Sequence, residues 1–136
     1  MQDLSADAKA LLESQKQTWP MLREGYGALD SIRTRTIQLD GFAMRVQFNP
    51  RRITSSAAKV DEESIRERKC FLCETNLPPQ QRGIAFGDDY LILCNPFPIF
   101  PEHFTIPHRR HVPQRIYDSF GAMLDLARAI GSRYTI

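Results

Sequence analysis

The chain carries two cysteines, Cys70 and Cys73, at a spacing that lets both thiolates bind one metal ion. The total of three cysteines is odd, which argues against a framework of disulfides. In a reducing compartment, a Cys-x-x-Cys pair more often binds metal or has redox activity than forms a structural disulfide. The pair therefore favours a metal site, with zinc as the expected ion.

Zinc in a tetrahedral site needs four ligands, and the chain has no second Cys-x-x-Cys. Histidines or carboxylates must supply the others, and the three histidines are His103, His108 and His111. Two alternatives stay open: a redox pair, and a pair of inert, half-buried thiols. A redox pair of the thioredoxin type normally begins a helix after a buried strand, whereas this pair follows a charged segment. Cys94 lies in an apolar strand and is expected to be a small core residue.

The segment from Asn95 to Pro98 forms a stiff loop, because its two prolines remove two hydrogen-bond donors from any strand ladder. Its asparagine amide and the nearby rings of Phe97 and Phe100 suit a nucleoside, with hydrogen bonds from the amide and stacking on the rings. The alternative is an apolar turn that fills the core.

The length of 136 residues predicts one domain, or one lobe of a larger protein. With 42% hydrophobic and 25% charged residues, the composition is that of a globular protein in solution. No apolar run approaches the roughly 20 residues that span a bilayer. The first residues lack the basic start and apolar run of a signal peptide, so we expect a cytoplasmic protein with no membrane partner.

The net charge of +2 predicts no class of partner by itself. No long basic run is interleaved with aromatic residues, so nucleic acid is not expected as a partner. Basic residues gather in two stretches that either hold phosphate groups or form a solvated surface. These residues are Arg45, Arg51, Arg52 and Lys59 in the first stretch, and Arg109, Arg110 and Arg115 in the second.

Apolar periodicity predicts a helix over residues 5–19 with Ser5 as its N-cap, and a second short helix that ends near Leu29. Pro113 is expected to open a long helix near the end of the chain. Its predicted apolar stripe consists of Ile116, Phe120, Met123, Leu124, Ala127 and Ile130.

A hairpin is predicted from residues 36–39 and 42–48 around the turn Asp40-Gly41, with one face of the second strand buried. Residues 51–60 are expected to form an irregular loop, and residues 61–68 a short helix. Further strands are expected at 84–86, 90–94 and 103–106, and a strand is expected to begin at 134–136. The simplest assembly is an α+β fold with an antiparallel sheet of about five strands and helices on one face.

Together these segments resemble the histidine-triad (HIT) superfamily, in particular its galactose-1-phosphate uridylyltransferase and dinucleoside polyphosphate phosphorylase branches. The segment from Asn95 to Ile106 resembles the asparagine–proline–histidine strand pair of that superfamily. Residues 48–51 are similar to an Asn-Pro segment of the uridylyltransferases, and Cys70-Phe71-Leu72-Cys73 resembles their zinc-binding Cys-x-x-Cys. The resemblance covers residues 42–136 and divides the chain into an N-terminal helical segment, 1–33, and a HIT-like α+β domain, 34–136.

The resemblance implies roles for eight residues. The implied zinc ligands are Cys70 and Cys73, together with His103 or His111. The implied nucleotide-binding residues are Asn95, Phe97, Arg51 and Arg52. Zinc is then a structural ion, and the ligand is a nucleotide or nucleotide sugar.

The chain departs from the superfamily at the catalytic motif, because it contains no His-x-His-x-Gln/His. In the superfamily, a histidine of this motif attacks the α-phosphorus and forms a nucleotidyl-histidine. We therefore expect the N-terminal part of a nucleotidyltransferase or phosphorylase that is incomplete at its C-terminus, with no catalytic residue in these 136 residues. The alternative is a non-catalytic, zinc-stabilised module that binds a nucleotide or a protein. In that case the unfinished strand at 134–136 is an edge that a second copy would cover.

Overall fold

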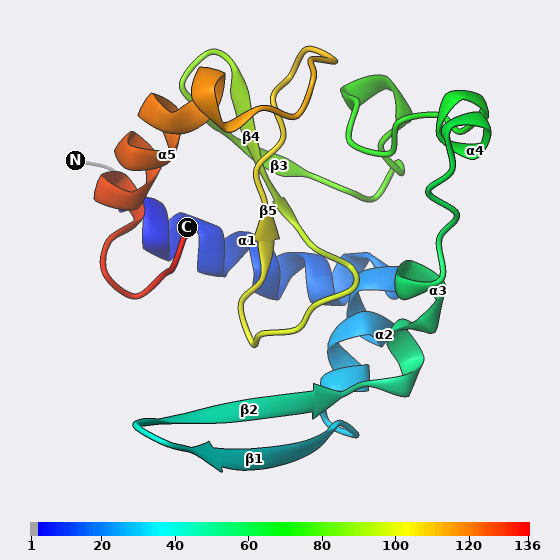
Figure 1. Cartoon of the computed structure of the whole chain (residues 1–136). Helices are drawn as coiled ribbons and strands as arrows, with labels where there is room; N and C mark the ends of the chain where they lie inside the picture. Colours follow the sequence, from blue (N-terminus) through cyan, green and yellow to red (C-terminus); the bar gives the residue numbers. More distant parts are fainter. Residues whose placement is uncertain (1–2) are drawn as a thin grey trace.

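The computed structural model describes residues 3–136, and for residues 54 and 55 it describes the backbone alone. Within these residues, helices and antiparallel strands combine in an α+β fold (Figure 1). The elements are α1 (Leu4–Thr18), α2 (Pro20–Leu29), β1 (Arg33–Leu39), β2 (Phe42–Phe48), η1 (Pro50–Arg52), α3 (Ile53–Ser56), α4 (Glu62–Glu67), η2 (Glu74–Asn76), β3 (Gly83–Phe86), β4 (Tyr90–Cys94), β5 (Phe104–Thr105) and α5 (Ile116–Ile130). The α+β class is as predicted.

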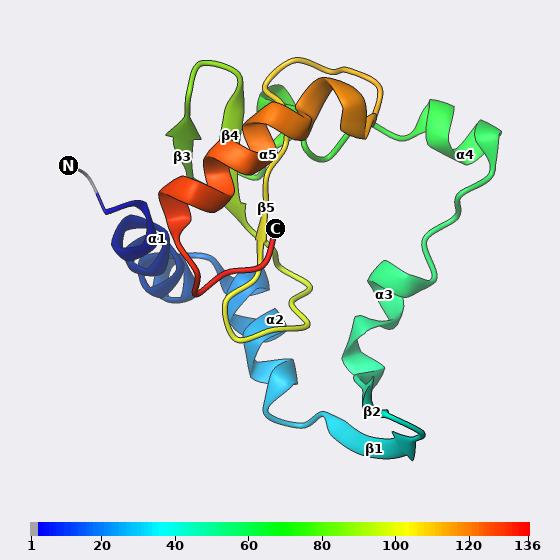
Figure 2. The ribbon, with the colours of Figure 1, turned by 60° about the vertical axis from the view of Figure 1, so that its left-hand side comes forward.

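The strands form two sheets instead of the single sheet that we predicted. The strands β1 and β2 pair only with each other, and β3, β4 and β5 form a second sheet in that order. Both sheets are antiparallel. Both views place the β1–β2 hairpin beyond α2, apart from the three-stranded sheet (Figures 1 and 2). Residues 49–82 lie between the two sheets in the chain and contribute no strand to either.

The core lies where α1 and α2 cover the three-stranded sheet. Asp3, and not the predicted Ser5, is the N-cap of α1, and its carboxylate accepts bonds from the backbone N–H groups of Ser5 and Ala6. Pro20 begins α2, a position where its missing N–H costs nothing. The main buried cluster joins both helices to β4 through Leu12, Trp19, Leu22, Tyr26 and Cys94. Residues 1 and 2 of the predicted N-terminal segment lie outside the described residues.

The hairpin differs from the prediction in its burial, because all residues of β1 and β2 are exposed. Four apolar residues of β2 each lie opposite a residue of β1. The pairs are Phe42 with Leu39, Met44 with Ile37, Val46 with Arg35, and Phe48 with Arg33. Residues that pair directly project from the same face of a hairpin. The hairpin therefore has one largely apolar face that no described element covers. We name the six apolar residues of this face, Ile37, Leu39, Phe42, Met44, Val46 and Phe48, the hairpin patch.

The helix α5 buries only part of the predicted stripe, because Ile130 is buried and Met123 is half-buried. It begins at Ile116 and not at Pro113, because Arg115 is extended, with φ −130° and ψ 131°. Leu126 and Ile130 are buried, whereas Ile116, Phe120 and Leu124 are more than half exposed. Apolar residues on both sides of a helix leave the sequence ambiguous about which side faces the core.

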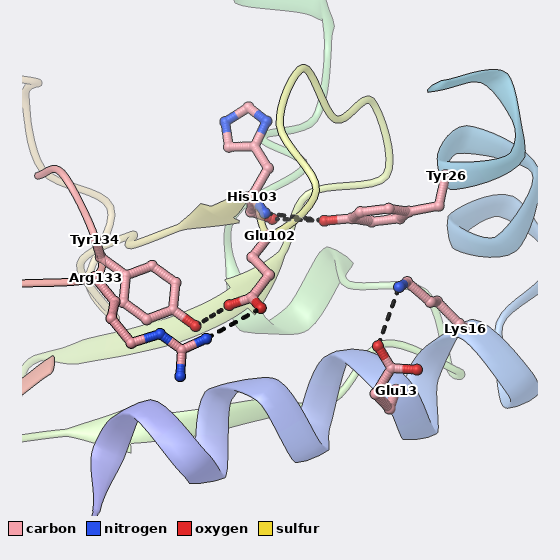
Figure 3. Close-up of polar contacts among 7 residues, drawn as sticks. All are labelled: Glu13, Lys16, Tyr26, Glu102, His103, Arg133 and Tyr134. Atoms are coloured by element: carbon pink, nitrogen blue, oxygen red, sulfur yellow. Dashed lines mark hydrogen bonds and ion pairs between the residues drawn. The ribbon is translucent and has the colours of Figure 1, made fainter. Parts of the chain in front are cut away.

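Two predicted irregular or extended segments are also corrected. Residues 50–56 form the helical turns η1 and α3 within the predicted loop, and the side chain of Asn49 caps the first of them. Residues 134–136 form no strand, and the hydroxyl of Tyr134 donates a hydrogen bond to the carboxylate of Glu102 instead (Figure 3). Within residues 3–136, no helix has both the length and the apolar character that a membrane span requires.

Candidate metal centre

The two cysteines lie on a tight turn that leads into η2. The backbone N–H of Cys73 donates to the carbonyl of Cys70 at 3.4 Å, and that of Asn76 donates to the carbonyl of Cys73 at 2.8 Å. The side-chain amide of Asn76 also donates to the Cys70 carbonyl, at 2.9 Å. These bonds close the turn from both ends and hold the two side chains on one side of it.

A histidine from a distant part of the chain completes the group. The Sγ atom of Cys73 lies 3.3 Å from Nδ1 of His111, which is 38 residues further along the chain. The potential ligand atoms of Cys70, Cys73 and His111 all lie within 4.8 Å of one another, so the three side chains could hold a metal ion. Both cysteines are half-buried and His111 is exposed. Among residues 3–136, no fourth histidine, cysteine or carboxylate belongs to this group.

An ion pair fastens the cysteine turn to the segment that carries His111. Glu74, the residue after Cys73, accepts a bond of 2.9 Å from the guanidinium of Arg109. The backbone N–H of Arg109 in turn donates to the carbonyl of Asp89 at 2.7 Å, in the turn between β3 and β4. The three-stranded sheet therefore positions His111 against the thiols. Sequence reasoning placed Arg109 in a basic stretch and not at this site, and it did not identify Glu74, although the place of Glu74 directly after Cys73 is a local clue.

The two thiols have unequal acidity. Burial alone would raise the pKa of Cys70, but the backbone N–H groups of Leu72 and Cys73 and the thiol of Cys73 together lower it below its usual value. The hydrogen bond to Cys70, followed by burial, raises the pKa of Cys73. Metal ligation requires thiolates, so binding an ion at this site would release protons.

The other two histidines lie elsewhere. His103, one of the two histidines predicted as alternative ligands, accepts a bond from the backbone N–H of Ile99 at its Nδ1, at 3.2 Å. Its backbone N–H and carbonyl both bond to the hydroxyl of Tyr26 (Figure 3). Burial, followed by the nearby Arg52, lowers the pKa of His103. His108 accepts a bond from the backbone N–H of Arg110, and its ring packs edge-on against Tyr90.

The predicted nucleotide-binding residues are only partly brought together. The side chain of Asn95 is engaged locally, because its Oδ1 accepts from the Phe97 N–H at 2.8 Å and its Nδ2 donates to the Thr105 hydroxyl at 3.2 Å. Phe97 is half-buried, and its carbonyl accepts a bond of 3.0 Å from Nε of Arg52. Arg51 is exposed. Of these four residues, Arg52 alone lines the large groove beside α2.

The thiols in the structure are free, as a metal site requires. No disulfide joins Cys70, Cys73 or Cys94. Burial raises the pKa of Cys94 to about 12, and the residue is 1% exposed, in agreement with the predicted core role. Two sulfur donors and one imidazole form a set typical of zinc sites, although the set alone does not specify the ion.

Comparison with known proteins gives one match. The family model described as a domain of unknown function (DUF4922) matches residues 11–136. Neither a curated protein nor a solved structure matches the chain. The match begins within α1 and includes all three cysteines and all three histidines. The chain belongs to the DUF4922 family.

Proposed function

We propose that Cys70, Cys73 and His111 bind a structural zinc ion. The supporting observation is the meeting of a Cys-x-x-Cys turn with a histidine 38 residues away, at 3.3 Å between sulfur and nitrogen. The ion would tie the segment between β2 and β3 to the segment after β5. Neither segment has a strand, and the helices between β2 and β3 are all six residues or shorter, so the metal would supply cohesion that these segments otherwise lack. Metal binding requires reduced thiols, which agrees with a cytoplasmic location.

We further propose that the chain is the N-terminal part of a HIT-like nucleotidyltransferase or phosphorylase that acts on a nucleotide sugar or dinucleotide. Support comes from the ordered segments at 48–51, 70–73 and 95–106, and from a basic groove that Arg52 lines. In this proposal the nucleophilic histidine belongs to a His-x-His-x-Gln/His motif outside these 136 residues. The five strands would then form parts of a HIT-like sheet.

The second candidate is a non-catalytic zinc-stabilised module that binds a nucleotide or a protein. This candidate uses the same cysteine–histidine group and the same basic groove, and it requires no nucleophilic histidine. The two candidates share the zinc site; they differ in catalysis, and the second also allows a protein in place of a nucleotide as the ligand.

A second copy of the chain is the partner that we propose for the hairpin patch. Arg33 and Arg35 lie at one end of this face, and Asp40 lies in the turn at the other end. Two hairpins stacked face to face about a two-fold axis, with their strands antiparallel, would place each arginine end over the partner's Asp40 turn. This charge complementarity favours a second copy over an unrelated apolar partner.

The proposal is tested by measuring zinc content and nucleotide binding together. Purified protein is expected to contain one zinc per chain, and Cys70→Ser is expected to lose most of it and to unfold at a lower temperature. Cys94→Ala is the matched control: it should retain zinc while losing some core stability. ADP or UDP should bind to the zinc-loaded chain without turnover. Stoichiometric zinc that is retained in Cys70→Ser would contradict the metal site, and a chain that binds neither nucleotide would contradict the nucleotide function.

A further inference from the structure

A large groove runs beside α2 and carries an excess of positive charge. Its volume is about 1350 Å³, and its walls come from α2, the end of β2, the turns η1 and α3, and the loop at residues 99–101. Four basic residues and one acidic residue line it, an excess of three positive charges, whereas the whole chain has a net charge of +2. The charged residues are Lys16, Arg23, Arg45, Arg52 and Asp30.

Three of these four cations have no acidic partner. Lys16 pairs with Glu13 at 3.2 Å and also lies over the ring of Tyr26 (Figure 3). Among residues 3–136, no carboxylate lies within ion-pair distance of Arg23, Arg45 or Arg52. Arg23 and Arg52 instead donate to backbone carbonyls, which hold their side chains in place without neutralising them.

A buried amide in the same groove lacks an acceptor. The Oδ1 of Asn49 accepts the backbone N–H of Arg51 at 3.2 Å, which fixes the orientation of the amide. Its Nδ2 is buried and has no hydrogen-bond partner among the described residues. A buried donor without an acceptor is unfavourable, and an oxygen atom of a ligand in the groove would satisfy it.

The groove also offers an apolar surface. Phe48 and Phe100 line it and are both more than half exposed. We infer that this groove binds a small phosphorylated compound, with its phosphate held by Arg23, Arg45 and the Asn49 amide and its planar part against Phe100. The inference deepens the proposed function, because it assigns the phosphate end of the nucleotide to residues outside the segment at 95–97.

The test is calorimetric titration of the zinc-loaded chain with inorganic pyrophosphate, ADP and UDP. Arg45→Gln removes one cation from an exposed strand. Asn49→Asp keeps the cap on the Arg51 N–H but replaces the free donor with a negative charge. Each change should weaken the binding of all three ligands about tenfold or more. Arg128→Gln is the control: it makes the same charge change on the exposed surface of α5, outside the groove, and should alter affinity less than about twofold.

The outcomes separate this inference from the proposed function. If ADP and UDP bind but neither groove variant weakens them, the groove is not the site, while nucleotide binding stands. If the two groove variants weaken the binding of pyrophosphate, but ADP and UDP bind no more tightly than pyrophosphate does, the phosphate site stands and the nucleotide function fails. Equal weakening in Arg128→Gln would reduce the effect to general surface charge and overturn the inference. Tighter binding of a single-stranded oligonucleotide than of ADP would overturn the assignment to a small ligand.

Discussion

Tyr26 shows how one buried side chain connects two segments of this molecule. The hydroxyl lies on α2, accepts the N–H of His103 at 3.0 Å and donates to the His103 carbonyl at 3.4 Å. The ring is 9% exposed and belongs to the main core cluster. The residue therefore fastens the loop that follows β4 to the helical layer, next to the groove.

The acidity of Tyr26 predicts how stability changes in alkaline solution. Burial, partly offset by the hydrogen bond to His103, raises its pKa from 10.0 to about 12. The folded state therefore holds the proton more tightly than the unfolded state. This contribution to stability is complete below pH 10 and is lost as the pH rises toward 12. Urea unfolding should give a free energy roughly 1 kcal/mol lower at pH 11 than at pH 9 from this group.

Tyr26→Phe is the control for this prediction. The variant should be less stable than the wild type at pH 9, because it leaves the His103 N–H without its partner. Its stability should nevertheless change less between pH 9 and pH 11. An equal change in both proteins would assign the alkaline loss to other groups, such as Tyr134, whose pKa is also raised to about 12 by burial and by Glu102.

At the level of single residues, the sequence predicted the two cysteines of the metal site but did not decide which histidine joins them. Cys70 and Cys73 are three residues apart, so their proximity follows from the backbone alone. The choice between His103 and His111 depends on how the segment after β5 lies against the cysteine turn. The Arg109–Glu74 ion pair and the hydrogen bond from Arg109 to Asp89 determine that placement. No local sequence pattern predicts either interaction.

At the level of elements, α2 and the proline loop make an unusually close contact. A Cβ atom placed on Gly25 would overlap the carbonyl oxygen of Pro96 and would lie 3.2 Å from Cδ of Pro98. Backbone atoms of a proline-stiffened loop cannot move aside cheaply. The close approach of this helix therefore requires glycine at position 25.

Gly25→Ala should destabilise the protein by about 1–3 kcal/mol, because the helix or the loop must shift. Gly27→Ala is a matched control in the same helix: a Cβ at that position meets nothing within 4 Å. It should leave stability unchanged or raise it by up to about 1 kcal/mol, since alanine favours a helix more than glycine does. Chemical unfolding of the two variants checks this, and a Gly25→Ala variant as stable as Gly27→Ala would contradict the contact.

Sequence periodicity predicted most elements but not what covers them. The Asp40-Gly41 turn and the alternation in β2 fix the hairpin and the composition of its two faces. They do not reveal that Arg45 and Gln47 of the polar face line the groove. In α5, apolar residues lie on both sides of the helix, so the sequence again does not show which side is buried. Burial depends on contacts between distant segments, which local patterns do not record.

At the level of the whole molecule, the hairpin patch predicts self-association. Strands of seven residues are about 23 Å long, so the stacked face is small and the dimer should be weak and dependent on concentration. Met44→Lys places a charge at the centre of this face and should shift the protein toward the monomer in sedimentation velocity experiments. Gln38→Lys, on the polar face of the same hairpin, should leave the equilibrium unchanged. A wild-type chain that stays monomeric at millimolar concentration would contradict this interface.

The central claim is that Cys70, Cys73 and His111 bind one zinc ion. X-ray absorption at the zinc edge measures it most directly. The wild type should give two sulfur ligands at about 2.3 Å and one imidazole nitrogen at about 2.0–2.1 Å. His111→Ala should lose that nitrogen and bind zinc more weakly, whereas His103→Ala should keep the wild-type spectrum. A spectrum that changes in His103→Ala and not in His111→Ala, or one without sulfur, would contradict the site.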